Sequence, residues 1–136
     1  MLRTLEISAS GLAAQRLRMD TIAGNIAHSH TTMDETGKKS PFQRRMVVLQ
    51  SQSPGETGHR GVGVSATVET DTATVPRKIH DPSHPHADAD GYVTYPNINV
   101  ITEFVNALEA TRAYEANVST MQVTRSMIDS TFRLIG

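Results

Sequence analysis

The chain has 136 residues, with thirteen lysines and arginines against fourteen aspartates and glutamates, so its formal net charge is -1. A nearly neutral chain creates no field that attracts nucleic acid or an anionic membrane surface, and neither partner is expected. Apolar residues make up 38% of the chain and aromatic residues 4%, which predicts a thin or divided core. There are no cysteines, which excludes disulfides, thiolate metal sites and a thiol nucleophile.

The first segment, residues 1–30, is predicted to form one long helix from Leu2 to about Ala27. It contains no proline, and apolar residues recur every seven positions, as in one stripe of an amphipathic helix: Leu5, Leu12, Met19, Ile26. Arg3 and Glu6 interrupt any signal-peptide core near the start. We therefore expect a helix that packs against a partner, without a cleaved signal peptide or a membrane anchor.

The middle segment, residues 31–96, is rich in turns and holds all six prolines. Alternation of apolar and polar residues predicts a half-buried strand over 62–68, and weaker patterns predict strands over 44–50, 75–79 and 91–95. The stretch SQSPGETGHRG is predicted to be a loop. The related sequence GHRGVGV reverses the glycine order of a dinucleotide fingerprint and is interpreted as a loop that enters a strand.

The last segment, residues 97–136, is predicted to form a second long helix from Val100 to Ile135, with Asn99 as its N-cap and Glu103 in its first turn. Apolar rows spaced by seven give a coiled-coil-like seam. Its candidate residues are Phe104, Leu108, Tyr114, Val118, Met121, Ile128 and Phe132. Many β-branched residues weaken this helix in isolation, so we expect the terminal helices to order fully only on assembly.

These segments together predict a mainly α fold with a small β-rich middle. The long N- and C-terminal helices are expected to pair as an antiparallel coiled-coil-like hairpin, with the small β module and its loops inserted between them.

The stretch HDPSHPHADADGYV raises the question of a metal site, because histidine and carboxylate are common metal ligands. An EF-hand loop that began at His86 would place Asn97 where a carboxylate is needed. For zinc, the three histidines lack regular spacing, and Pro82 and Pro85 fix the backbone between them. No G-x-S-x-G elbow occurs either. We expect no metal, no cofactor and no catalytic residue, and interpret this stretch as a rigid connector whose aspartates bond turn amides.

Two stretches of the chain resemble a known family. ISASGLAAQRLRMDTIAGNIAHSHT resembles the signature that opens the axial proteins of the bacterial flagellum. HDPSHPHADADGYVTYPNINV and the following ATRAYEANV resemble motifs of the proximal rod family FlgC within that group. The residues that match the motifs are Ser8, Gly11, Leu12, Asn25, Asp81, Pro82, Asp88, Gly91, Tyr92, Pro96, Asn97, Arg112, Tyr114, Glu115 and Asn117.

The resemblance implies a non-enzymatic structural subunit of the flagellar rod in the basal body, which polymerises through its terminal helices and transmits torque across the periplasm. It also implies as partners other copies of the chain, other rod subunits, basal-body ring and rod-base adaptor proteins, and the flagellar type III apparatus that exports it uncleaved. From the residues alone, a soluble helical adaptor or a closed homo-oligomer that uses the same seams stays open as the alternative, and an enzyme ranks third.

Overall fold

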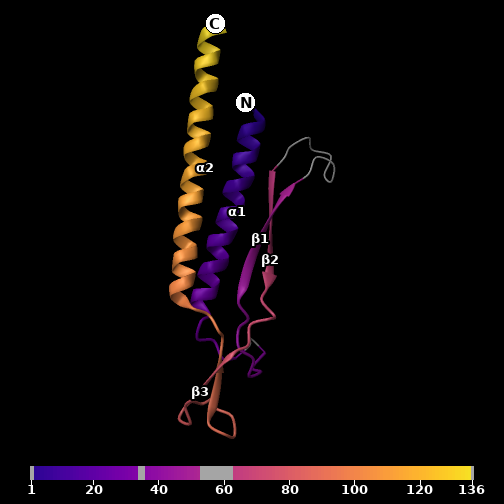
Figure 1. Cartoon of the computed structure of the whole chain (residues 1–136), viewed down its shortest axis with the longest axis vertical. Coiled ribbons are helices and arrows are strands. Elements are labelled where there is room, and N and C mark those ends of the chain that lie inside the picture. The colour runs from indigo at the N-terminus through magenta and orange to yellow at the C-terminus, as the bar shows by residue number, and fades with distance from the viewer. Residues whose placement is uncertain (1, 34–35, 53–62, 136) are drawn as a thin grey trace. The chain divides into compact units, whose positions relative to one another are not determined.

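A computed structural model of the chain describes residues 2–33, 36–52 and 63–135. Two long helices, α1 (Leu2–Ala27) and α2 (Val100–Ile135), enclose the strands in sequence (Figure 1). The described strands are β1 (Arg45–Gln52), β2 (Gly63–Thr70), β3 (Arg77–His80) and β4 (Tyr92–Tyr95). The predicted mainly helical fold with a small β region in its middle is confirmed. Most of the predicted loop and of the GHRGVGV sequence lies in residues 53–62, outside the described part.

The described residues divide into two compact units, each built from segments far apart in the sequence. Unit 1 comprises the described residues of 1–19, 47–67 and 107–136, and unit 2 those of 20–46 and 68–106. Both helices contribute residues to both units. The expected division of the chain into segments 1–30, 31–96 and 97–136 stays a prediction.

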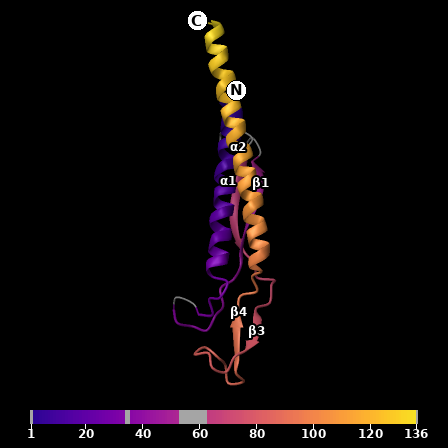
Figure 2. The ribbon, with the colours of Figure 1, turned by 90° about the vertical axis from the view of Figure 1, so that its left-hand side faces the viewer.

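The strands form two separate two-stranded sheets. β1 pairs with β2, and β3 pairs antiparallel with β4, with Arg77 opposite Tyr95 and His80 opposite Tyr92 (Figure 2). Val93 of β4 is 1% exposed and is among the few buried apolar side chains of unit 2. Such short ribbons are marginal alone, so each depends on the elements that it contacts.

Within unit 1, α1 and α2 run antiparallel, and α1 lies between α2 and the β1–β2 sheet (Figure 1). Gly11 lies against Asn117, while Arg18, further along α1, pairs with the earlier residue Glu109 of α2. Residue numbers therefore rise along one helix as they fall along the other, as predicted for the terminal helices.

Local signals explain where α2 begins and why it tolerates its threonines. The Oδ1 atom of Asn99 accepts the backbone N–H groups of Ile101 at 3.0 Å and Thr102 at 3.3 Å, which confirms the predicted N-cap. Threonine hydroxyls donate to the carbonyl four residues earlier in four places: Thr111, Thr120, Thr124 and Thr131. These bonds satisfy the hydroxyls inside the helix. Neither helix, over its described residues, is long and apolar enough to cross a membrane.

The core of the described chain is thin, as the composition predicts. The buried apolar residues are Ala14, Ile22, Val93 and Ala110, and they are outnumbered by buried polar residues: Ser8, Asn25, Ser29, Thr32, Glu103 and Thr124. The predicted stripe of Leu5, Leu12, Met19 and Ile26 is only half-buried. Small and polar residues therefore occupy the deepest positions of the helix pair, and hydrogen bonds must help to define how the elements meet.

Candidate assembly surface

The side chain of Asn25 joins the end of α1 to the start of β1 in unit 2. Its Nδ2 atom donates to the Arg45 carbonyl oxygen at 2.7 Å, and its Oδ1 atom accepts the Arg45 backbone N–H at 2.9 Å. The amide thus pairs with β1 as a neighbouring strand would. Nδ2 also lies 3.1 Å from Oε2 of Glu103 in α2. One residue of α1, 1% exposed, therefore holds both other elements.

Glu103 is a buried carboxylate, 1% exposed, at the start of α2. Its Oε1 atom accepts hydrogen bonds from Nε and Nη2 of Arg44 at 2.8 and 2.6 Å. Because the other oxygen accepts the Asn25 amide, both carboxylate oxygens are occupied by donors of the chain itself. The cluster of Asn25, Arg44, Arg45 and Glu103, the unit 2 junction, is therefore a structural cross-link between three elements.

Sequence patterns did not predict this cross-link: Glu103 was expected only to occupy a favourable place in the first helical turn, and Arg44 only to begin a weak strand. One signal was present: Glu103, Ala110 and Asn117 are spaced by seven, so a carboxylate lies on the same row as the most buried alanine of α2. A charged residue on a buried row requires a partner.

The histidine-rich stretch starts at the last residue of β3, ends in β4 and forms the connection between these two strands. Asp81 Oδ1 accepts the Ser83 N–H at 3.2 Å, and Asp88 Oδ1 accepts the N–H groups of Asp90 and Tyr92 at 3.0 and 2.7 Å. These bonds confirm that the aspartates bond turn amides. Gly91 has φ of 78°, a conformation that favours glycine.

The imidazoles of this stretch bond to neighbouring protein groups. His84 Nδ1 accepts the His86 backbone N–H at 3.1 Å, and His86 Nδ1 lies 2.8 Å from Oγ1 of Thr32. The His80 ring meets Tyr92 edge-on at 5.0 Å between ring centroids. Among the described residues, no group of three or more histidines and carboxylates is arranged to hold a metal ion.

The candidate seam residues of α2 divide between two sides of the helix. Tyr114, Val118, Met121 and Ile128 are half-buried. Phe104 and Leu108 instead are 56% and 61% exposed, and they share an outward row with neighbours at helical spacing: Ile101, 76% exposed, and Val105, 52% exposed. We call Ile101, Phe104, Val105 and Leu108 the outward apolar face. No described residue of the chain buries it.

At its other end, α2 continues past the start of α1 within unit 1 (Figure 1). With Gly11 opposite Asn117, the first residues of α1 lie opposite about residue 126 of α2. Beyond this point Phe132 and Leu134 are 71% and 87% exposed. Residues 127–134 thus form the α2 overhang, which α1 does not cover and which exposes the apolar side chains of Met127, Phe132 and Leu134 among polar neighbours.

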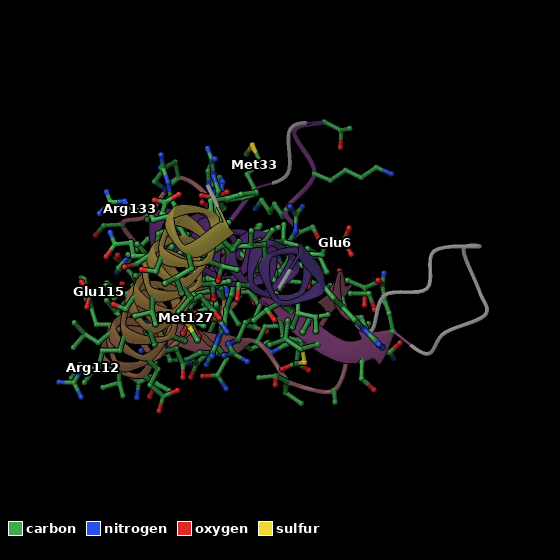
Figure 3. All side chains as sticks on the ribbon, turned by 90° about the horizontal axis from the view of Figure 1, so that it is seen from above. Glu6, Met33, Arg112, Glu115, Met127 and Arg133 are labelled. Carbon is green, nitrogen blue, oxygen red and sulfur yellow. The ribbon has the colours of Figure 1, made fainter. Side chains whose placement is uncertain are left out.

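Residues that match the motifs occupy several structural roles. Ser8 is buried on α1, Pro96 is buried before α2, and Leu12, Tyr114 and Asn117 are half-buried. Arg112 and Glu115 are exposed and project from α2 away from α1 (Figure 3). Gly11 lies against Asn117, and Asn25 belongs to the unit 2 junction. The remaining motif residues lie in the β3–β4 connection, at the start of β4, or between β4 and α2: Asp81, Pro82, Asp88, Gly91, Tyr92 and Asn97.

Comparison with known proteins decides the family. Residues 89–134 match a family described as flagellar basal body rod FlgEFG protein C-terminal. The flagellar basal-body rod protein FlgC of Bacillus subtilis is 36% identical over 137 aligned residues, covering 92% of this chain and 91% of the relative. FlgC of Salmonella typhimurium is 36% identical, covering 98% and 97%, and FlgC of Aquifex aeolicus is 37% identical, covering 94% and 92%. The chain belongs to the FlgC family.

Membership of the FlgC family agrees with the observed site chemistry. The buried carboxylate of Glu103 accepts hydrogen bonds from Arg44 and from the Asn25 amide. The exposed surface of α2 includes large apolar side chains that no described residue covers. FlgC relatives are structural rod proteins, and this FlgC-family chain is a structural subunit of the flagellar basal body rather than an enzyme.

Proposed function

We propose that this FlgC-family chain polymerises into the proximal rod through its terminal helices, with neighbouring subunits seated on the outward apolar face of α2. The observation that carries the proposal is the exposure of Ile101, Phe104, Val105 and Leu108, which lies between 52% and 76%. An apolar row of this kind gains free energy when a neighbour removes it from water, by about 25 cal/mol for each Å² covered.

The α2 overhang is proposed as a second contact. It lies at the opposite end of α2 from the outward apolar face, so a neighbour that covers one surface need not cover the other. Contacts between different surfaces of successive subunits do not close on themselves and extend into a tube or filament. Half-buried seam residues, Tyr114, Val118, Met121 and Ile128, would complete the packing between helices once neighbours are present.

Torque transmission follows from such packing. Many helix contacts shared along an axis resist twisting, because closely packed interiors deform little. We propose that the chain serves in this way as part of the drive shaft that crosses the periplasm, in contact with other rod subunits, rings and rod-base adaptors. Export through the flagellar type III apparatus, with the N-terminal segment as an uncleaved address, is supported by the signature motif alone.

The experiment replaces Phe104 and Leu108 with aspartate in cells that lack their own copy of the gene. An unpaired carboxylate in an apolar contact costs several kcal/mol, so rods should fail to form and swimming should stop, while export of the subunit continues. Both side chains are more than half exposed, so the chain itself should fold normally, which circular dichroism would check.

Gln122→Asp is the matched control, because Gln122 is exposed on the same helix without being part of either apolar surface. It should swim. Normal swimming of the Phe104→Asp/Leu108→Asp variant would refute the outward face as a contact. A purified chain that forms a discrete closed oligomer through this face, with no incorporation into rods, would favour the adaptor alternative.

A further inference from the structure

Consecutive residues of α1 meet two different elements in unit 1. The Ser10 hydroxyl donates to the Ile7 carbonyl at 2.7 Å and accepts the backbone N–H of Val64, in β2, at 3.0 Å. At the next position, a Cβ added to Gly11 would lie 3.1 Å from Nδ2 and 3.3 Å from Oδ1 of Asn117 in α2. Ser10 thus contacts β2 through its hydroxyl, and Gly11 lets Asn117 of α2 approach closely because it has no side chain.

The start of β2 approaches α1 as closely as Asn117 does. A Cβ added to Gly63, at the start of β2, would lie 3.1 Å from the Ser10 hydroxyl oxygen. Glycine weakens both helices and strands relative to alanine, so its presence at two facing elements is explained by the close approach that it allows. The second glycine of α1, Gly24, differs, because nothing lies within 4 Å of an added Cβ there.

The apolar core of unit 1 cannot by itself select one alignment of these elements. Among the described residues of unit 1, the buried apolar ones are Ala14 and Ala110, which are small and similar in shape. The seven-residue repeats of both helices would present comparable rows after a slip of one heptad, about 10 Å along the axis. Such a slip would remove Asn117 from Gly11 and separate Arg18 from Glu109, which now lie 3.2 Å apart.

We propose that Ser10, Gly11, Val64 and Asn117 form a unit 1 junction that specifies the register of α1 against α2 and β2. The junction parallels the unit 2 junction, in which Asn25 contacts a strand backbone and a polar side chain of α2. Close approach and hydrogen bonds, which tolerate little displacement, supply the positional specificity that alanine packing lacks. The register then decides which residues of α2 remain outside the helix pair and available to neighbours.

The first test compares the two glycines of α1. Gly11→Leu must displace Asn117 and should stop swimming, whereas Gly24→Leu enters open space and should swim. Asn117→Ala alone should slow swimming only partly, because it removes one side of the junction without placing an obstruction in it. The double variant Gly11→Leu/Asn117→Ala should swim better than Gly11→Leu, because the second change removes the obstructing amide. Gly11→Leu that swims as well as Gly24→Leu, or a double variant as impaired as Gly11→Leu, would overturn the proposal.

The second test reads the register directly. Since the chain has no cysteine, spin labels can be attached at Arg16→Cys and Ser130→Cys, two exposed positions offset along the helix pair of unit 1. A slip of one heptad changes their separation by up to about 10 Å. In assembled rods or the folded full chain, Gly11→Leu should move the label distance by several Å, and adding Asn117→Ala should return it toward the original value. An unchanged distance in Gly11→Leu would refute a role in register.

Discussion

The two units contain parts of the same two helices, yet they join them by different means. In unit 2, the Arg44–Glu103 ion pair is buried on its carboxylate side, with side-chain exposures of 28% and 1%, and Asn25 bonds both α2 and the β1 backbone. In unit 1, the Arg18–Glu109 pair has exposures of 28% and 63%, the Thr111 hydroxyl donates to the Met19 sulfur at 3.6 Å, and small residues such as Ala14, Ala110 and Gly11 lie at the buried or close positions of the helices. The parts of α1 and α2 in unit 2 are thus cross-linked by buried polar contacts, whereas their parts in unit 1 make fewer specific contacts.

This difference indicates how a rod subunit can be both foldable and dependent on neighbours. A buried polar cluster stabilises only one arrangement of the elements that contribute to it. Sparse contacts and exposed apolar residues leave unit 1 and the α2 overhang short of stabilising packing, which neighbouring subunits can supply. We therefore expect unit 2 to be the more stable part of the isolated chain.

The largest effect is expected when one partner of the buried ion pair in the unit 2 junction is removed. Arg44→Leu leaves the buried Glu103 carboxylate with the Asn25 amide as its remaining donor in the unit 2 junction. Removal of one partner of a buried pair costs about 3–5 kcal/mol of the free energy of unfolding. The measurement is the urea midpoint of the purified chain, followed by near-ultraviolet circular dichroism of Tyr92 and Tyr95 in a Tyr114→Phe background.

A double variant separates charge burial from lost packing. Arg44→Leu/Glu103→Leu removes the unpaired carboxylate and should recover part of the lost stability, because a buried ion pair is often replaceable by apolar residues. If Arg44→Leu unfolds at the same urea concentration as the unaltered chain, the unit 2 junction contributes nothing to stability.

An intermediate effect compares two stretches of α2 by amide hydrogen exchange in the isolated chain. Amides of residues 104–106, next to the unit 2 junction, should exchange on the order of tenfold more slowly than those of residues 127–134, a difference of about 1.4 kcal/mol in opening free energy. In assembled rods, the overhang should become protected and far-ultraviolet helicity should rise. Equal protection of both stretches in the isolated chain would contradict assembly-dependent ordering.

The smallest expected effect concerns the exposed ion pair of unit 1. Arg18→Leu should lower the free energy of unfolding by less than about 1 kcal/mol, because exposed pairs are solvated and screened by salt. The loss should shrink further when the ionic strength rises from 0.01 to 1 M, over which the Debye length falls from about 30 to 3 Å. A loss as large as that of Arg44→Leu would show that the two units are not held differently.

Much of the fold was predictable because its signals are local. Heptad spacing and the absence of proline gave the extent of α1, the Asn99 cap gave the start of α2, and alternation located β2 to within about two residues. The Asp81 and Asp88 turns followed from the short polar side chains beside glycine and proline. The family resemblance depended on the same contiguous motifs, which is why sequence alone carried the functional hypothesis so far.

The tertiary structure alone decided how distant residues meet. Glu103, Arg44 and Asn25 lie far apart in the sequence, and nothing in their local patterns requires them to converge. Periodicity placed Phe104 and Tyr114 in neighbouring apolar rows, but a row does not state whether it faces a helix of its own chain or solvent. That choice depends on the register of α1, α2 and β2, because a helix with apolar residues on several sides can pack in more than one way until specific contacts select one.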